Sequence, residues 1–190
     1  MINNPLMQTK VDVHVNVDVR PAVRMLLGAN MTRIKYDTRL HEERKRFDFL
    51  RVNVTAGRGA FHSTCAAELI LDGLPMVDPI GNEWVARGMF MNIGKAQNMK
   101  LFKDKLFELE GDWVQRDPEV HPLILEGSPT KDDGCIFRGR KYPEVDFIVL
   151  DFTYASTIQG DKDMRKFADM IQYQITRGAF PNLCSILIMQ

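Results

Sequence analysis

The first clear pattern along the chain is a strict alternation of apolar and polar residues between Lys10 and Val19. The apolar positions are Val11, Val13, Val15, Val17 and Val19, and the polar positions between them are Asp12, His14, Asn16 and Asp18. A period of two residues is typical of a strand with one buried face. Pro21 suits the first turn of a short helix, which we expect to run through Leu27 and to end at Gly28.

A second pattern is a strand, a glycine turn and a helix in direct succession. The strand is predicted over residues 50–55 (LRVNVT), the turn has the sequence AGRGAFHST, and the helix starts with CAAELIL. Gly73 and Pro75 follow the helix and predict its end. Residues 76–94 show no clear period.

The second half of the chain alternates between predicted strands and helices. We expect a helix over residues 97–110, a short strand within HPLILE (121–126), and a loop or hairpin over residues 128–141. The apolar runs VDFIVLD (145–151) and LCSILIM (183–189) are typical of buried parallel strands. Between them, Asp161 can cap a helix that ends at Gly178.

This alternation predicts an α/β fold, with a mainly parallel sheet and helices on both faces. We expect one domain over residues 1–190, with an N-terminal strand and short helix in residues 1–30 and the core of the fold in residues 50–190.

Composition narrows the class of protein. The 25 basic and 25 acidic residues cancel, so the overall charge gives no argument for nucleic acid or for an anionic membrane. Three widely spaced cysteines do not suit a disulfide framework, and Cys65 is interpreted as a packing residue. Without an apolar run of signal-peptide or membrane-spanning length, we expect a cytoplasmic protein.

The stretch from Met31 to Arg51 carries seven basic and four acidic residues. It could contact nucleic-acid phosphates. Because acids are interleaved with the bases, the stretch also suits a solvated surface helix or an extended connection. We favour this interpretation over nucleic-acid binding.

The glycine turn carries the main candidate chemistry. Where a strand enters a helix through glycines, the first free amides of the helix can bind an anion. The standard phosphate-binding loop has the pattern G-x-x-x-x-G-K-[ST]. With Ser63 at the hydroxyl position, Ala56 and Phe61 replace the two glycines and His62 replaces the lysine.

With the later strand that ends in Asp151, these residues resemble the P-loop NTPase superfamily over residues 50–190. The final strand and Gln190 look like the sensor strand of RecA/DnaB-type ATPase cores. The resemblance implies ATP or another nucleotide with Mg²⁺ as the ligand. It assigns the phosphate site to Gly57, Arg58, Gly59, His62, Ser63, Thr64 and Asp151, with Ser63 and Asp151 near the metal, and it leads us to expect Asp151 on the strand adjacent to the loop strand.

The departures from the motif predict weak or absent hydrolysis. A neutral histidine offers one donor and no charge, and Phe61 adds bulk where backbone must approach phosphate. Glu126 and Glu68 are the candidates for a catalytic glutamate. The alternative is that the glycines only form a corner, and that the chain is a non-catalytic protein-binding or assembly protein, either as a homo-oligomer or with another protein.

A metal site is a third hypothesis. Asp12 and His14 are two residues apart on one strand face, about 6.6–6.8 Å from each other, and Asp18 lies on the same face. We favour a solvent-facing polar row over a metal site, because an intact site needs a further ligand from elsewhere in the chain.

Overall fold

The computed structural model describes residues 18–40, 46–55, 62–92, 96–110, 123–125, 139–151 and 158–189. The helices are α1 (Arg20–Tyr36), the 3₁₀ turn η1 (Thr38–Leu40), α2 (Phe47–Leu50), α3 (His62–Asp72), α4 (Ala96–Glu110) and α5 (Ile158–Thr176). The strands are β1 (Arg51–Val54), β2 (Leu74–Val77), β3 (Glu83–Ala86), β4 (Gly88–Asn92), β5 (Leu123–Leu125), β6 (Phe147–Asp151) and β7 (Ser185–Met189).

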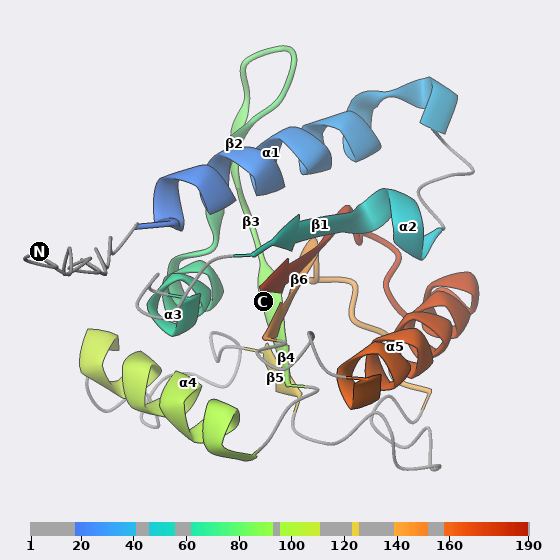
Figure 1. The fold of residues 1–190 in the computed structure, drawn as a ribbon. Helices are drawn as coiled ribbons and strands as arrows, with labels where there is room; N and C mark the ends of the chain where they lie inside the picture. The colour runs from blue at the N-terminus through green and yellow to red at the C-terminus, as the bar shows by residue number, and fades with distance from the viewer. Residues whose placement is uncertain are drawn as a thin grey trace, which may run out of the picture.

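Five of these strands form one sheet in the order β1-β7-β6-β4-β5, and every neighbouring pair is parallel (Figure 1). The connection from β1 to β4 and the connection from β6 to β7 cross the sheet in opposite directions. Because such crossovers are right-handed, their helices belong on opposite faces. Figure 1 shows α3 and α4 on one side of the sheet and α5 on the other. The predicted α/β class and parallel sheet are confirmed.

The apolar runs in the sequence explain why β6 and β7 are interior strands of the sheet. The side chains from Phe147 to Leu150 and from Ser185 to Met189 are all buried. Strands that are covered on both faces need apolar residues at every position rather than at alternate positions. The prediction of these strands is confirmed to within two residues.

Buried polar contacts fix the amino edge of the sheet. The Asn30 side-chain amide of α1 donates to the Leu50 carbonyl (3.1 Å) and to Ser185 Oγ (3.0 Å), and Ser185 Oγ also donates to the Leu50 carbonyl (3.2 Å). Ser185 is completely buried, so these partners remove the cost of an unsatisfied hydroxyl. The network joins α1 to the start of β1 and the start of β7.

Strands β2 and β3 form a separate antiparallel hairpin in the stretch that showed no clear period. The Asp78 carboxylate closes the turn by accepting from the Ile80 and Asn82 amides. The inner face of the hairpin packs against α1, and the Lys35 ammonium lies 3.4 Å from the centre of the Trp84 ring. Each strand has only four residues, which is too short for a recognisable period.

Two expected helix ends are wrong. Helix α1 continues through Gly28 to Tyr36, because Met31 and Ile34 add another buried turn to its apolar face. Helix α5 starts at Ile158, so Asp161 lies inside the helix and is not its cap. None of the helices in the described part of the chain is long and apolar enough to cross a membrane.

The helix predicted over residues 97–110 is confirmed as α4, and Phe102 of α4 stacks on Phe90 of β4 with ring centres 3.6 Å apart.

At the start of β4, a Cβ atom on Gly88 would lie 2.4 Å from the Phe147 ring and 2.9 Å from Ile70 Cδ1. At Gly88 the backbone of β4 therefore lies too close to Phe147 and Ile70 for a residue with a Cβ atom.

We expect Gly88→Ala to lower the free energy of unfolding by about 1–3 kcal/mol, because the added methyl overpacks this contact. Gly28→Ala is the matched control: its Cβ would make ordinary contacts at 3.7 and 3.9 Å. Inside a helix, this change is expected to stabilise by about 0.5–1 kcal/mol. Urea denaturation measures both, and an equal effect of the two variants would contradict the close approach at Gly88.

Candidate functional site

The carboxyl ends of four strands lie level at one edge of the sheet. The register pairs Val54 of β1 with Met189 of β7, Met189 with Asp151 of β6, and Asp151 with Asn92 of β4. The polar residues Asp151 and Asn92 therefore end neighbouring strands at the same level. In open parallel sheets, ligands bind beyond this edge.

The expectation that Asp151 lies on the strand adjacent to β1 is wrong, because β7 lies between β1 and β6. The chain leaves β6, passes through α5 and returns as β7 in the gap beside β1. Two strand spacings separate Val54 from Asp151, or about 10 Å. A ligand of several bonded atoms, or a magnesium ion that keeps its water molecules, can span that distance.

Asn92 was not among the predicted site residues. Helix α4 follows β4 on the side of the sheet that carries α3, whereas α5 follows β6 on the opposite side (Figure 1). The edge between β4 and β6 is therefore a topological switch point, the usual place for a ligand crevice. The signal in the sequence was the polar residue that ends the apolar run GMFMN.

The residues of the predicted phosphate loop divide into two groups. His62, Ser63 and Thr64 form the first turn of α3, and all three are partly buried. The predicted loop residues Gly57, Arg58, Gly59 and Phe61, the candidate glutamate Glu126 and the candidate sensor Gln190 lie outside the described residues. The first turn of a helix carries amides without helical partners, so this turn can donate to an anion.

His62 is the most unusual group at this edge. Its Nε2 atom is buried and has no hydrogen-bond partner among the described residues. Burial also lowers the pKa of His62 below its ordinary value, so the neutral ring is favoured. A buried polar atom without a partner is costly, and a bound ligand could satisfy it.

Glu68, one of the two candidate glutamates, is held in ion pairs. Its carboxylate oxygens lie 2.7 Å from the Arg20 guanidinium and 3.2 Å from the Arg24 guanidinium. These contacts tie the start of α1 to α3. Both carboxylate oxygens of Glu68 are therefore engaged in holding the two helices together.

Cys65, next to the first turn of α3, is completely buried. Burial raises the pKa of its thiol to about 11, so the thiol is protonated at neutral pH. A protonated, inaccessible thiol is a poor nucleophile. This agrees with its interpretation as a packing residue.

The metal hypothesis at the N-terminal strand has one described member. Asp18 forms an ion pair with Arg20 at 2.7 Å, and hydrogen bonds from Arg20 lower the pKa of its carboxyl group. Asp12 and His14 lie outside the described residues. Within the described ranges, no three His, Cys, Asp or Glu side chains gather as a metal site.

The basic stretch suggested for nucleic acid is engaged in contacts within the chain. The Arg33 guanidinium donates to the Phe49 carbonyl (3.1 Å), and Arg39 pairs with Asp37 (2.8 Å). Lys35 lies over the Trp84 ring, as described above. These contacts fix the connection between α1 and α2, and nucleic-acid binding by this stretch stays a prediction.

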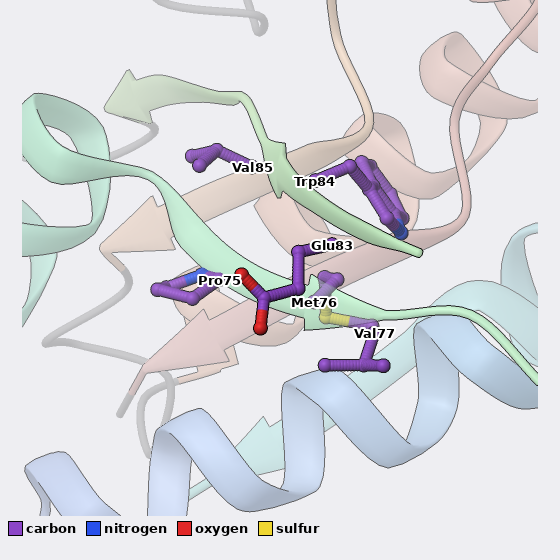
Figure 2. Close-up of a pocket in the computed structure, with 6 residues that line it drawn as sticks. All are labelled: Pro75, Met76, Val77, Glu83, Trp84 and Val85. Atoms are coloured by element: carbon purple, nitrogen blue, oxygen red, sulfur yellow. The ribbon is translucent and has the colours of Figure 1, made fainter. Parts of the chain in front are cut away.

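An open pocket of about 320 Å³ lies on the β2–β3 hairpin, away from the carboxyl edge of the sheet (Figure 2). Its lining residues are Pro75, Met76, Val77, Glu83, Trp84 and Val85. Val77 is 57% exposed and Val85 56% exposed, and Ile80 in the turn is 85% exposed. Helix α3, about 16 Å long, separates this hairpin from the His62 turn.

The burial of His62 predicts a pH dependence of stability. In the unfolded chain His62 takes up a proton near its ordinary pKa of 6.5, whereas in the folded chain it does so only at lower pH. The stabilising contribution of the neutral ring is therefore complete above that ordinary pKa and is lost as the pH falls toward the folded value.

We expect the unfolding free energy of the wild type, minus that of His62→Gln, to decrease from pH 8 to pH 5. Urea denaturation across that range measures it, and the subtraction removes the contributions of the other histidines. A difference that stays constant with pH would contradict the lowered pKa.

In comparisons with known proteins, no family model, no curated protein and no solved structure matched this chain.

Proposed function

We propose that the protein is a divergent P-loop NTPase-like domain of the cytoplasm that binds a nucleotide or a related phosphate ligand with weak or no hydrolysis. The ligand would lie at the carboxyl edge of the sheet, between the first turn of α3 and the tip of β6.

The observation that carries this proposal is the common level of the strand ends. Val54, Met189 and Asp151 are in register, so the segment that joins β1 to α3 starts at the level at which Asp151 ends β6. The helix that follows this segment offers its free amides at the same edge. The end of β1 with the start of α3, and the end of β6 far along the chain, therefore lie at the same edge of the sheet.

The residues present fit a phosphate ligand in part. The amides of the first α3 turn and the unpartnered Nε2 of His62 are suitable for phosphate oxygens. A magnesium ion held by the Ser63 hydroxyl and by Asp151 would neutralise part of the phosphate charge. The lowered pKa of His62 keeps that ring uncharged, so it cannot replace the lysine of a standard loop. For this reason we expect binding without efficient hydrolysis.

We expect His62→Lys to tighten the binding of ATP with Mg²⁺ by about tenfold or more, because a charge-assisted hydrogen bond contributes ~1.5–3 kcal/mol. Isothermal titration calorimetry with ATP, ADP and pyrophosphate, each with and without Mg²⁺, measures the effect. Thr38→Lys is the matched control, since it adds a lysine at an exposed position near the opposite edge.

The outcome separates a phosphate site from a simple corner in the chain. Tighter binding in His62→Lys alone supports the site, and tighter binding in both variants indicates a general effect of charge. If neither the wild type nor His62→Lys binds any of the three ligands at millimolar concentration, the proposal is wrong.

The outer face of the hairpin favours a second function, protein binding or assembly on the same scaffold. Pro75, Val77 and Val85 are exposed on one face, and Ile80 extends from the turn. Apolar side chains that gather on a projecting element are typical of a contact surface.

If the chain assembles with itself through this face, Val85→Glu should weaken self-association by about tenfold or more, because it buries a charge in the contact. Analytical ultracentrifugation over a range of concentrations measures the effect. Leu101→Glu on α4 is the control, since Leu101 is equally an exposed apolar residue. A wild type that remains monomeric throughout would exclude self-assembly.

A further inference from the structure

We propose that the amino edge of the parallel sheet binds single-stranded nucleic acid through a basic surface assembled from five separate segments of the chain. This edge lies opposite the carboxyl edge, so binding here does not require a nucleotide at the site proposed above. We call this surface the basic edge. Its members are the exposed side chains of Arg33, Lys35, Arg46, Arg51, Arg87, Arg140, Lys141 and Arg177.

The end of α1 and the start of β1 form one side of the basic edge. The Arg33 guanidinium, one helical turn after Asn30 of the buried polar network, donates to the Phe49 carbonyl (3.1 Å). Arg46 directly precedes α2, and Arg51 is the first residue of β1. These three arginines therefore lie around the start of the same strand.

Helix α5 adds cations at the middle of the sheet. It returns the chain from the carboxyl end of β6 to the amino end of β7, so Arg177, directly after its last turn, lies at the amino edge. The Phe47 amide of α2 donates to Gln172 Oε1 of α5 (2.8 Å), which joins this helix to the β1 side. The turn after α5 accepts a hydrogen bond from the Tyr142 amide (2.7 Å), so Lys141 is its neighbour.

Asp146 links Lys35 and Arg87 at the other side of the basic edge. Its Oδ2 atom accepts from the Arg87 amide (2.9 Å), at the step into β4. Burial raises the pKa of the Asp146 carboxyl group, and the Arg87 amide and the charges of Lys35 and Arg87 oppose that rise. The basic edge therefore extends from β1 to β4, which is three strand spacings or about 14 Å.

Positive charge predominates on this surface. Within the described ranges, none of its eight cations forms an ion pair, whereas Arg20, Arg24 and Arg39 do. Apart from Asp37, which pairs with Arg39, the same segments carry three carboxylates, those of Asp48, Glu144 and Asp146. The chain as a whole is neutral, so this local excess is a matter of folding and not of composition. An excess of unpaired cations attracts a polyanion.

Aromatic rings lie among the cations of the basic edge. Lys35 lies over Trp84 (3.4 Å), Arg46 over Phe49 (5.2 Å) and Arg177 over Tyr173 (5.0 Å), each distance measured to the ring centre. The Tyr173 ring is also 54% exposed. An exposed ring beside a cation can stack on a nucleic-acid base while the cation contacts a phosphate.

These residue types favour nucleic acid over an anionic membrane. Six of the eight cations are arginines, whose planar guanidinium groups bind phosphate through two parallel hydrogen bonds. A membrane-binding surface also inserts aliphatic side chains. In the described part of the chain, the large exposed aliphatic residues lie on the first half of α1, on the β2–β3 hairpin and on α4. Single strands are favoured over duplexes because their unstacked bases are accessible to Tyr173.

Fluorescence anisotropy tests the proposal, with labelled single-stranded DNA and RNA of about 20 nucleotides and with a DNA duplex of the same length. We expect the combined variant Arg51→Gln, Arg87→Gln and Lys141→Gln to bind single strands at least about tenfold more weakly than the wild type. Its salt dependence, the slope of log K against log salt, should be smaller by about two, because three phosphate contacts are lost.

The matched control removes three exposed cations from other surfaces, by Lys100→Gln, Arg165→Gln and Lys166→Gln. An equal loss of affinity in both combined variants would overturn the proposal, because it would indicate a general effect of charge. A wild type that binds no single strand at low salt would also overturn it. Binding of phosphatidylserine vesicles in place of single strands would assign the surface to a membrane and would equally overturn it.

A second pair of variants tests stacking. Tyr173→Ala should weaken single-strand binding by about fivefold or more and leave duplex binding unchanged. Phe107→Ala on α4 is the control, since Phe107 is 57% exposed and distant from the basic edge. If Tyr173→Ala binds single strands as tightly as the wild type does, the assignment to single strands is wrong. Both replaced side chains are exposed, so this pair decides even where a combined variant does not fold.

Discussion

The pairing of β7 with β1 on one side and with β6 on the other is the constraint on which the rest of the structure depends. Every described residue of β7 is buried, and its register sets the levels of both neighbours. Without β7, the end of β1 and the end of β6 would have no fixed relation. Because β7 also occupies a full strand position, the same pairing keeps the tip of β1 and Asp151 about 10 Å apart.

Polar contacts determine how the helices lie on this sheet. The apolar face of α1 could slide along the valines of β1, since hydrophobic contact is not directional. The Asn30 network at the amino edge and the Glu68 ion pairs with the first turns of α1 hold α1 at two places. The same pairs engage both carboxylate oxygens of Glu68.

The sequence was sufficient wherever a long apolar pattern matched its surroundings. The strands β6 and β7 and the helices α3 and α4 were predicted because their own residues specify burial. The end of α1 was not, because Gly28 is a local stop signal that the buried Met31 and Ile34 outweigh. The order of strands was also not predictable, since a period along the chain does not encode which strands become neighbours. The unpartnered nitrogen of His62 arises only from tertiary burial, which no local pattern shows.

The edge of β1 and the proposed ligand site are physically connected. β1 ends at the segment that leads to His62, yet among the described strands β1 is held on one side alone, whereas β6 is held on both. A strand with a single partner is the less stable support, because half of its backbone groups lack a hydrogen-bonded neighbour. The support of the turn that leads to His62 therefore depends mainly on the pairing of β1 with β7.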